Sequence, residues 1–410
     1  MASNLSKTAR DNRANQLNPT HPAHHTARGT PSADAQNLAE HSKAVLDNRA
    51  NQLNPNHHLY GERDAVSFMP DVLAVSVSEA SLKPETRHLG AFEIGGHRVV
   101  REHMRPRVLV TGSCGLVGAA LEAELTRKGW DVRGFDIKGV GTNYGDILDG
   151  SSLRSIVGQV SGIIHLAAVS RVAEAERDPD LCWRTNVDGL RNIVAAAAAA
   201  PSRPWLVFSS SREVYGEAGI FPVYEEAPLR PINTYGRSKV EGEHLVAGCR
   251  ARGVSAAIIR LANVYGSIDD YPDRVIPAFV KAAVLGAPIR LEGPSNTLDF
   301  THVADVARGI AELALRLTSG FEFPQPVQFV TGEPVVLGDL ARKVRALASS
   351  CSIVDFLPPR RYGVTRFYGT RERAASLLGW EPEVSLDDGL RKLIAEFRSA
   401  LVIRQEQESV

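Results

Sequence analysis

From residue 107 onward, short apolar runs alternate with longer stretches in which apolar residues recur at helical spacing. The apolar runs cover residues 108–110, 131–136, 162–168 and 205–208, and the helical stretches cover 116–127, 181–200 and 235–252. Strands that alternate with helices predict a parallel sheet with helices on both faces. The predicted class is therefore α/β, with a doubly wound sheet in residues 106–265.

The pattern after this sheet predicts a smaller α/β part in residues 266–400. Helices are expected at 275–285, 305–317 and 386–401, with a short strand at 300–303 and a tail at 401–410. Before the sheet, residues 91–100 read as a hairpin around Gly95 and Gly96. This hairpin belongs to a short extension, residues 65–105, that is expected to pack on the main domain.

Residues 1–64 have a different composition, rich in Asn, His, Ala and Pro, and are predicted to form a largely disordered arm. Within it, residues 6–21 are echoed by residues 42–57. The duplicated segment is a docking element for a protein partner, a substrate for modification, or a tolerated duplication. Although the arm holds six histidines, no cysteine or carboxylate is interleaved at ligand spacing, so no metal site is predicted.

Composition narrows the function classes. Lys+Arg and Asp+Glu both number 47, and no basic run with interleaved aromatics is present, which disfavours nucleic-acid binding. No apolar run approaches the roughly 20 residues of a membrane span. The four cysteines are scattered, as expected of reduced thiols. A cytoplasmic location is the expectation.

The first strand leads directly into a glycine-rich turn, residues 111–118, and then into a helix. Glycines in this context let the backbone approach a pyrophosphate, and the helix N-terminus offers free N–H groups. Asp136 ends the second strand, 18 residues beyond Gly118, where a carboxylate meets ribose hydroxyls. A carboxylate would repel a 2′-phosphate, so NAD is favoured over NADP. Asp146 is predicted either to accept a hydrogen bond from adenine or to cap a helix.

A second group of residues suggests redox chemistry. Tyr235 and Lys239 stand four apart on a predicted helix, so the ammonium can lie beside the phenol and favour its ionised form. The strand at 205–208 delivers Ser209, Ser210 and Ser211 to the carboxyl edge of the sheet, where ligands bind in open α/β folds.

These motifs, in this order, resemble the extended short-chain dehydrogenase/reductase family, in its NAD-dependent epimerase/dehydratase branch. Residues 209–216, 260–266, 299–307 and 377–382 carry the resemblance further, over residues 107–397. It implies a Rossmann-type sheet, a nucleotide-sugar substrate bound by the smaller part, and Ser211, Tyr235 and Lys239 as catalytic residues. The residues expected to contact NAD are Gly112, Gly115, Leu116, Val117, Gly118, Asp136, Ile137, Asp146, Ile147, Leu166, Ala167, Ala168, Asn186, Ser209, Tyr235 and Lys239.

Substrate contacts are expected from Arg171, Ser211, Arg212, Glu213 and Asn263, where Asn263 matches the residue that contacts the substrate diphosphate. The chain departs from the family twice. Enzymes of this family that eliminate water carry an Asp-Glu pair where this chain has Arg212 and Glu213. Leu298 stands where an arginine usually clamps the substrate phosphate; Arg290, Arg360 or Arg361 could substitute.

The leading hypothesis is an NAD-dependent nucleotide-sugar epimerase that works through a transient 4-keto sugar, with Tyr235 as base. The alternatives are a dehydrogenase or ketoreductase, a dehydratase, and a dinucleotide-binding scaffold or sensor. Helices 181–200 and 235–252 are the predicted contact of a homodimer.

Overall fold

The computed structural model describes residues 91–94, 97–100, 105–358 and 362–408. The predicted arm, its repeated segment and most of the 65–105 extension lie outside these residues. The hairpin is confirmed, because β1 (Ala91–Ile94) pairs antiparallel with β2 (His97–Val100).

The centre of the main domain is a six-stranded, all-parallel sheet. The chain runs outward from β3 to β4 and then returns to the other side of β3 with β5. This reversal opens a crevice at the carboxyl ends of β3 and β5. The predicted Rossmann-type sheet is confirmed, and its strand order is β12 (Val327–Phe329), β7 (Ala256–Leu261), β6 (Trp205–Ser211), β5 (Gly162–His165), β3 (Arg107–Thr111) and β4 (Asp131–Phe135).

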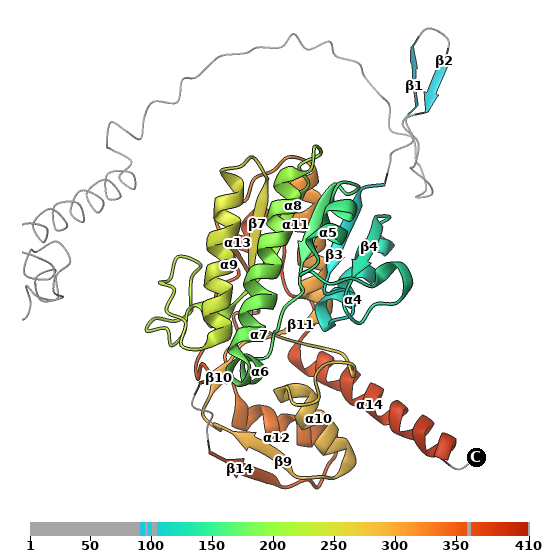
Figure 1. Ribbon diagram of the computed structural model, residues 1–410. Helices are drawn as coiled ribbons and strands as arrows, with labels where there is room; N and C mark the ends of the chain where they lie inside the picture. Colours follow the sequence, from blue (N-terminus) through green and yellow to red (C-terminus); the bar gives the residue numbers. More distant parts are fainter. Residues whose placement is uncertain (1–90, 95–96, 101–104, 359–361, 409–410) are drawn as a thin grey trace, which may run out of the picture. The chain divides into compact units, whose positions relative to one another are not determined.

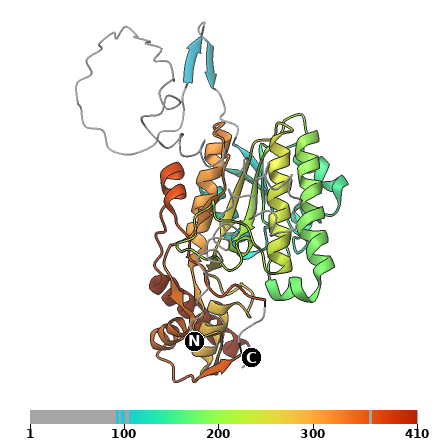
Figure 2. The ribbon, with the colours of Figure 1, turned by 90° about the vertical axis from the view of Figure 1, so that its left-hand side faces the viewer.

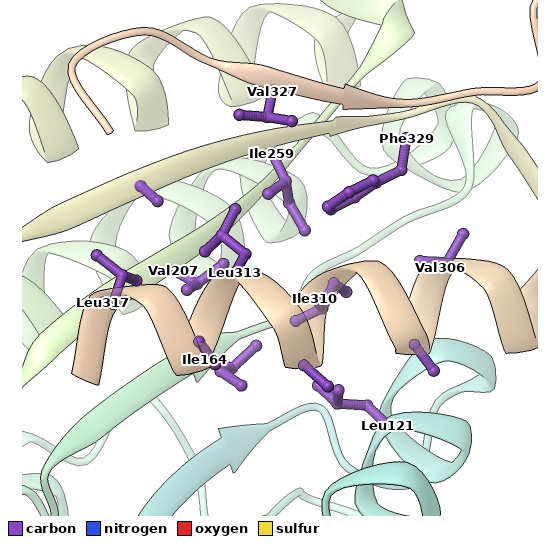
Figure 3. Packing of buried hydrophobic residues seen from close by; sticks show 14 of the residues in the cluster. Leu121, Ile164, Val207, Ile259, Val306, Ile310, Leu313, Leu317, Val327 and Phe329 are labelled. Carbon is purple, nitrogen blue, oxygen red and sulfur yellow. The ribbon is translucent and has the colours of Figure 1, made fainter. Parts of the chain in front are cut away.

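Helices cover both faces of this sheet (Figures 1 and 2). One layer holds α4 (Leu116–Arg127) and α11 (Val303–Thr318), and the other holds α5 (Gly150–Val157), α8 (Gly189–Ala199) and α9 (Thr234–Arg250). In the first layer, Leu121 of α4 and Ile310 and Leu313 of α11 share one apolar cluster with residues of the strands (Figure 3). This cluster packs the helix layer onto the sheet.

The structure differs from the predicted division at residue 265. Helix α11 and strand β12 follow that residue, yet they cover and extend the main sheet. The segment after α13 (Glu372–Leu378) also returns to this layer, where Trp380 Nε1 donates to the Asp305 carbonyl at 2.9 Å and its ring packs on Phe329. A single boundary in the sequence therefore does not separate the two parts, because segments after residue 265 pack on the main sheet as well as in the smaller part.

The smaller part lies below the sheet in Figure 1 and has its own apolar core. Its long terminal helix extends past the predicted end at residue 401. No helix in the described ranges is long and apolar enough to span a membrane. The elements are β8 (Asn263–Tyr265), α10 (Val275–Leu285), β9 (Ile289–Glu292), β10 (Thr297–Leu298), β11 (Phe300–His302), β13 (Val335–Val336), α12 (Leu337–Leu347), β14 (Val354–Leu357) and α14 (Leu386–Glu408).

Candidate active site

A cavity of about 840 Å³ opens at the carboxyl ends of the sheet strands and is also lined by residues of the smaller part. It brings together every predicted cofactor and substrate residue except Asn186. The glycine-rich turn, Asp136 and Asp146 line one region, and Ser211, Tyr235 and Lys239 line another. Residues separated by more than 100 positions in the chain thus share one site.

The glycine-rich turn forms a tight cradle between β3 and α4. A Cβ added to Gly112, whose φ is +72°, would lie 2.6 Å from the Ala167 nitrogen, so the turn packs against the backbone after β5. A Cβ on Gly118 would lie 2.2 Å from the Gly112 carbonyl oxygen. These approaches leave the first turn of α4 facing the cavity, which suits a pyrophosphate.

Gly118→Ala should abolish nucleotide retention, because its methyl group cannot coexist with the Gly112 carbonyl in the present turn. Gly158→Ala is the matched control, since its added Cβ would meet only the Arg154 carbonyl oxygen at 3.7 Å. We expect the control to keep its NAD and the Gly118 variant to lose at least about tenfold in NAD affinity. Equal NAD affinity in the two purified variants, measured by calorimetry, would contradict this role.

Two carboxylates lie along the same region. Asp136 accepts hydrogen bonds from the backbone N–H groups of Cys114 (3.1 Å) and Lys138 (2.8 Å), which fix it beside the turn. Asp146 accepts from the Leu148 N–H at 2.9 Å and does not cap a helix; Asp149 is the N-cap of α5. The capping alternative for Asp146 is therefore wrong, and its contact with adenine remains a prediction.

Tyr235 and Lys239 share one face of α9, as the four-residue spacing predicted. The Lys239 ammonium lies 5.6 Å from the centre of the Tyr235 ring and donates to the Ser209 carbonyl at 2.8 Å. Asn233 starts the helix by accepting from the Gly236 N–H at 2.7 Å. The tyrosine is therefore held in the first turn of a capped helix, directly over the end of β6.

Burial dominates the acidity of both groups. It raises the pKa of Tyr235 to about 12, although a hydrogen bond from Ser211 and the charge of Arg274 act in the opposite direction. It also lowers the pKa of Lys239 to about 8. This result is the reverse of the lowered phenol pKa that was predicted from the Tyr-Lys spacing, because desolvation outweighs the nearby charges.

Asn186 does not line the cavity, contrary to its predicted place among the cofactor contacts. Its amide accepts from the Val169 N–H at 2.8 Å and donates to the Val169 carbonyl (3.1 Å) and the Ser238 hydroxyl (2.9 Å). It lies in a π-helical turn, Arg184–Asp188, that interrupts the predicted 181–200 helix between α7 (Pro179–Trp183) and α8. Asn186 therefore ties the loop after β5 to the helix that carries Tyr235.

The two residues after Ser211 form a buried ion pair. Arg212 Nη2 lies 2.9 Å from Glu213 Oε1 and donates to Asn263 Oδ1 at 3.3 Å. The second oxygen of Glu213 accepts from Asn233 Nδ2 at 2.7 Å. Both Glu213 carboxylate oxygens are thus occupied within the cavity wall.

The sequence did not single out the segment that precedes α10. Arg171, a predicted substrate contact, is paired with Asp273 and has its guanidinium carbon 4.9 Å from the centre of the Tyr271 ring. Arg274 donates to the Ser170 hydroxyl at 3.1 Å and lies 3.3 Å from Asp270. The position of this segment directly after β8, at the edge of the sheet, is the signal that could have indicated it.

Comparison with known proteins agrees with this geometry. The family model described as "NAD dependent epimerase/dehydratase family" matches residues 108–323. The chain belongs to this family. It is 31% identical to the UDP-glucose 4-epimerase of Streptomyces lividans over 307 residues, 68% of this chain and 92% of that protein. It is 27% identical to UDP-glucuronic acid decarboxylase 1 of Danio rerio over 322 residues, 74% of this chain and 75% of that one.

The crystal structure of UDP-glucose 4-epimerase from Thermus thermophilus in complex with NAD has the same fold. Its TM-score is 0.65 at 26% identity, over 72% of this chain and 99% of that one. As a member of the epimerase/dehydratase family, the chain is an NAD-dependent enzyme of the extended short-chain dehydrogenase/reductase type.

The residues present fit NAD. Gly112 and Gly118 let the turn fold tightly on its own backbone and on Ala167, which leaves the first turn of α4 facing the cavity for a pyrophosphate, and Asp136 lies beside this turn. Lys239 and Ser209 lie further along the same cavity, next to Tyr235. In the described residues, no cluster of three or more His, Cys, Asp or Glu could hold a metal ion.

The chain differs from the usual family sequence at the position expected to bind the substrate phosphate. Leu298, at the position where the family usually has an arginine, is buried in the core of the smaller part and lines the cavity. Arg290 of β9 is exposed and lines the same cavity, so it is the proposed substitute. Arg360 and Arg361 lie outside the described residues.

Proposed function

We propose that this enzyme is a nucleotide-sugar 4-epimerase that oxidises and re-reduces a single carbinol. The observation that supports this function most directly is the state of Glu213. Its two oxygens are engaged by Arg212 and Asn233, and Arg212 replaces the acid that water elimination requires. Ser211, Tyr235 and Lys239 remain as the group that can act on a hydroxyl.

The side chains divide the work of oxidation. Ser211 orients the reacting hydroxyl, and Tyr235 receives its proton, with the Lys239 charge nearby to stabilise the phenolate. Bound NAD supplies a hydride acceptor that later returns the hydride. Because the same tyrosine can give the proton back, inversion needs no second acid or base, only a turn of the ketone within the cavity.

The direct test incubates the NAD-loaded protein with UDP-, dTDP- and GDP-hexoses and follows the products by NMR and absorbance at 340 nm. We expect a sugar inverted at carbon 4 and no net accumulation of NADH. Steady formation of NADH would instead indicate a dehydrogenase. A 4-keto-6-deoxy sugar would indicate a dehydratase, and released carbon dioxide a decarboxylase.

The reaction rate should rise with pH to a plateau near pH 8. The productive pair holds one proton, on Lys239, while Tyr235 is ionised. Below the Lys239 pKa of about 8 the pair holds two protons, so the rate should fall roughly tenfold per pH unit. Between this pKa and the Tyr235 pKa of about 12, the pair holds one proton in total. The fraction of enzyme in the productive form is then constant, which gives the plateau. Measurements of kcat/KM across this range should show the break, and a rate that declines above pH 7 would contradict it.

We also propose that α8 and α9 form the contact of a homodimer. The two helices lie side by side on the outer layer (Figure 2). Ala195 of α8 and Ala247 of α9 are exposed. Sedimentation equilibrium should give twice the chain mass. A double variant, Ala195→Glu with Ala247→Glu, should give one chain mass because it places like charges in the contact. A monomeric wild type would refute the proposal.

A further inference from the structure

Arg212 is the cavity residue whose chemistry the epimerase reaction leaves unexplained. It directly follows Ser211 and begins a short 3-10 turn, η4 (Arg212–Val214), at the end of β6. The residue is 9% exposed and lines the cavity. Arg212 therefore belongs to the wall of the site, next to the serine of the reacting hydroxyl, and its guanidinium carbon lies 5.9 Å from the centre of the Phe367 ring.

The hydrogen bonds of this guanidinium are incomplete. Nη2 serves both Glu213 and Asn263, whereas Nη1 is buried and has no hydrogen-bond partner among the described residues. Leaving such a donor without an acceptor is unfavourable, and more so for a charged group. Glu213 cannot turn to satisfy it, since Asn233 holds its other oxygen. A ligand acceptor would relieve this cost.

We propose that the substrate is a nucleotide-linked uronic acid, whose sugar carboxylate accepts a hydrogen bond from Nη1 of Arg212. This inference rests on the proposed 4-epimerase function. In a hexuronic acid the carboxylate is attached to carbon 5, the neighbour of the carbinol at carbon 4. Because Ser211 binds the hydroxyl at carbon 4, a guanidinium beside Ser211 lies near the position of the carboxylate on carbon 5. A planar, charged carboxylate also suits a guanidinium better than a neutral hydroxymethyl group does.

The substrate diphosphate is a less suitable partner for Arg212. It is attached to carbon 1, across the sugar ring from carbon 4, whereas Arg212 follows the serine that serves carbon 4. The exposed Arg290 comes from β9 of the smaller part and lines the same cavity. Two arginines on separate elements can therefore serve the two anionic ends of one substrate.

The pair between Arg212 and the sugar carboxylate also affects what happens to the ketone intermediate. Once carbon 4 is oxidised, the carboxylate is in the β position and can leave as carbon dioxide. The bond between carbons 5 and 6 then breaks, its electron pair enters the enolate of the ketone, and carbon 5 later takes a proton. A cation bound to the carboxylate stabilises its charge and opposes this transfer. Arg212 should therefore keep the carboxylate on the sugar while the ketone turns over.

Paired ligands test the proposal. UDP-glucuronic acid and UDP-glucose differ only at carbon 6, and the same pair is prepared with dTDP and GDP. Calorimetry is run on NAD-loaded protein in a Tyr235→Phe background, which prevents turnover. With at least one nucleotide, the uronate should bind roughly 10- to 100-fold more tightly than the glucose compound. Arg212→Gln should remove this preference, so that the uronate and the glucose compound bind within about threefold of each other.

Several outcomes would overturn the inference. These are no uronate preference with any nucleotide, or an Arg212→Gln variant that weakens both ligands equally, as a phosphate contact or a purely structural role predicts. Arg290→Gln is the matched control and should weaken both ligands by the same factor. Products from the preferred uronate, followed with unmodified enzyme, separate the two proposals. Absence of the 4-epimer would refute the proposed function while the binding preference would still stand.

Discussion

Replacing Glu243 by alanine should destabilise the fold by about 3–5 kcal/mol, the largest stability effect expected of a single side chain here. Glu243 lies one helical turn beyond Lys239 and is buried. Its oxygens pair with Arg260 at 2.8 and 2.6 Å, and Ser210 donates to it at 2.5 Å. The substitution leaves the Arg260 charge buried with only Tyr215 and the Glu225 carbonyl as acceptors. Thermal unfolding should shift downward by on the order of 10 °C.

Two comparisons separate the buried charge from the loss of a side chain. Glu241→Ala removes a half-exposed carboxylate from the same helix, whose pair with Arg191 spans 3.4 Å, and should cost less than about 1 kcal/mol. The double variant Glu243→Met with Arg260→Met should be more stable than Glu243→Ala, because no unpaired charge remains. Equal melting temperatures for the Glu241 and Glu243 variants would show that the buried pair contributes nothing.

The parts of the site that the sequence predicted are those that depend on the spacing of residues close together in the chain. A glycine-rich turn between a strand and a helix fixes its own geometry, so the cradle at Gly112 and Gly118 follows from neighbouring residues. The four-residue spacing likewise places Tyr235 and Lys239 on one helical face. Parallel strands then bring their carboxyl ends to one edge, which is why Ser211 joins them.

The parts that the sequence did not predict depend on contacts between distant segments. Nothing near residue 327 indicates that β12 completes a sheet begun at residue 107, because only pairing with β7 makes it a sixth strand. Asn186 was assigned to NAD, but its amide is used by Val169 and Ser238. The charge of Arg274 lowers the pKa of Tyr235, although Arg274 comes from a segment that the spacing did not connect to the tyrosine.

The acidity of Tyr235 illustrates the same limit. Spacing established that a cation shares its helical face, and it suggested a lowered pKa. The packing of α6 (Val172–Arg177), α7 and the strand ends around the ring raises the pKa instead, because burial is a property of the assembled layers. The hydrogen bond from Ser211 and the charges of Arg274 and Lys239 thus have to favour the ionised form of the tyrosine.

Tyr235→Phe should reduce the rate of hydride transfer by roughly 10²- to 10⁴-fold, the usual contribution of a positioned general base. The ring is 9% exposed and packs against Ala175 and Cys182, so phenylalanine can keep its place. The variant should retain NAD, since the cradle and Asp136 are untouched. The measurement is the transient at 340 nm when NAD-loaded enzyme is mixed with its nucleotide sugar.

Tyr224→Phe is the matched control, because Tyr224 is 46% exposed and does not line the cavity. It should transfer hydride at the wild-type rate. If Tyr235→Phe keeps more than about a tenth of that rate while holding NAD, another group must take the proton. Glu213 would then be the next candidate, and its release from Arg212 and Asn233 would become the step that controls the chemistry.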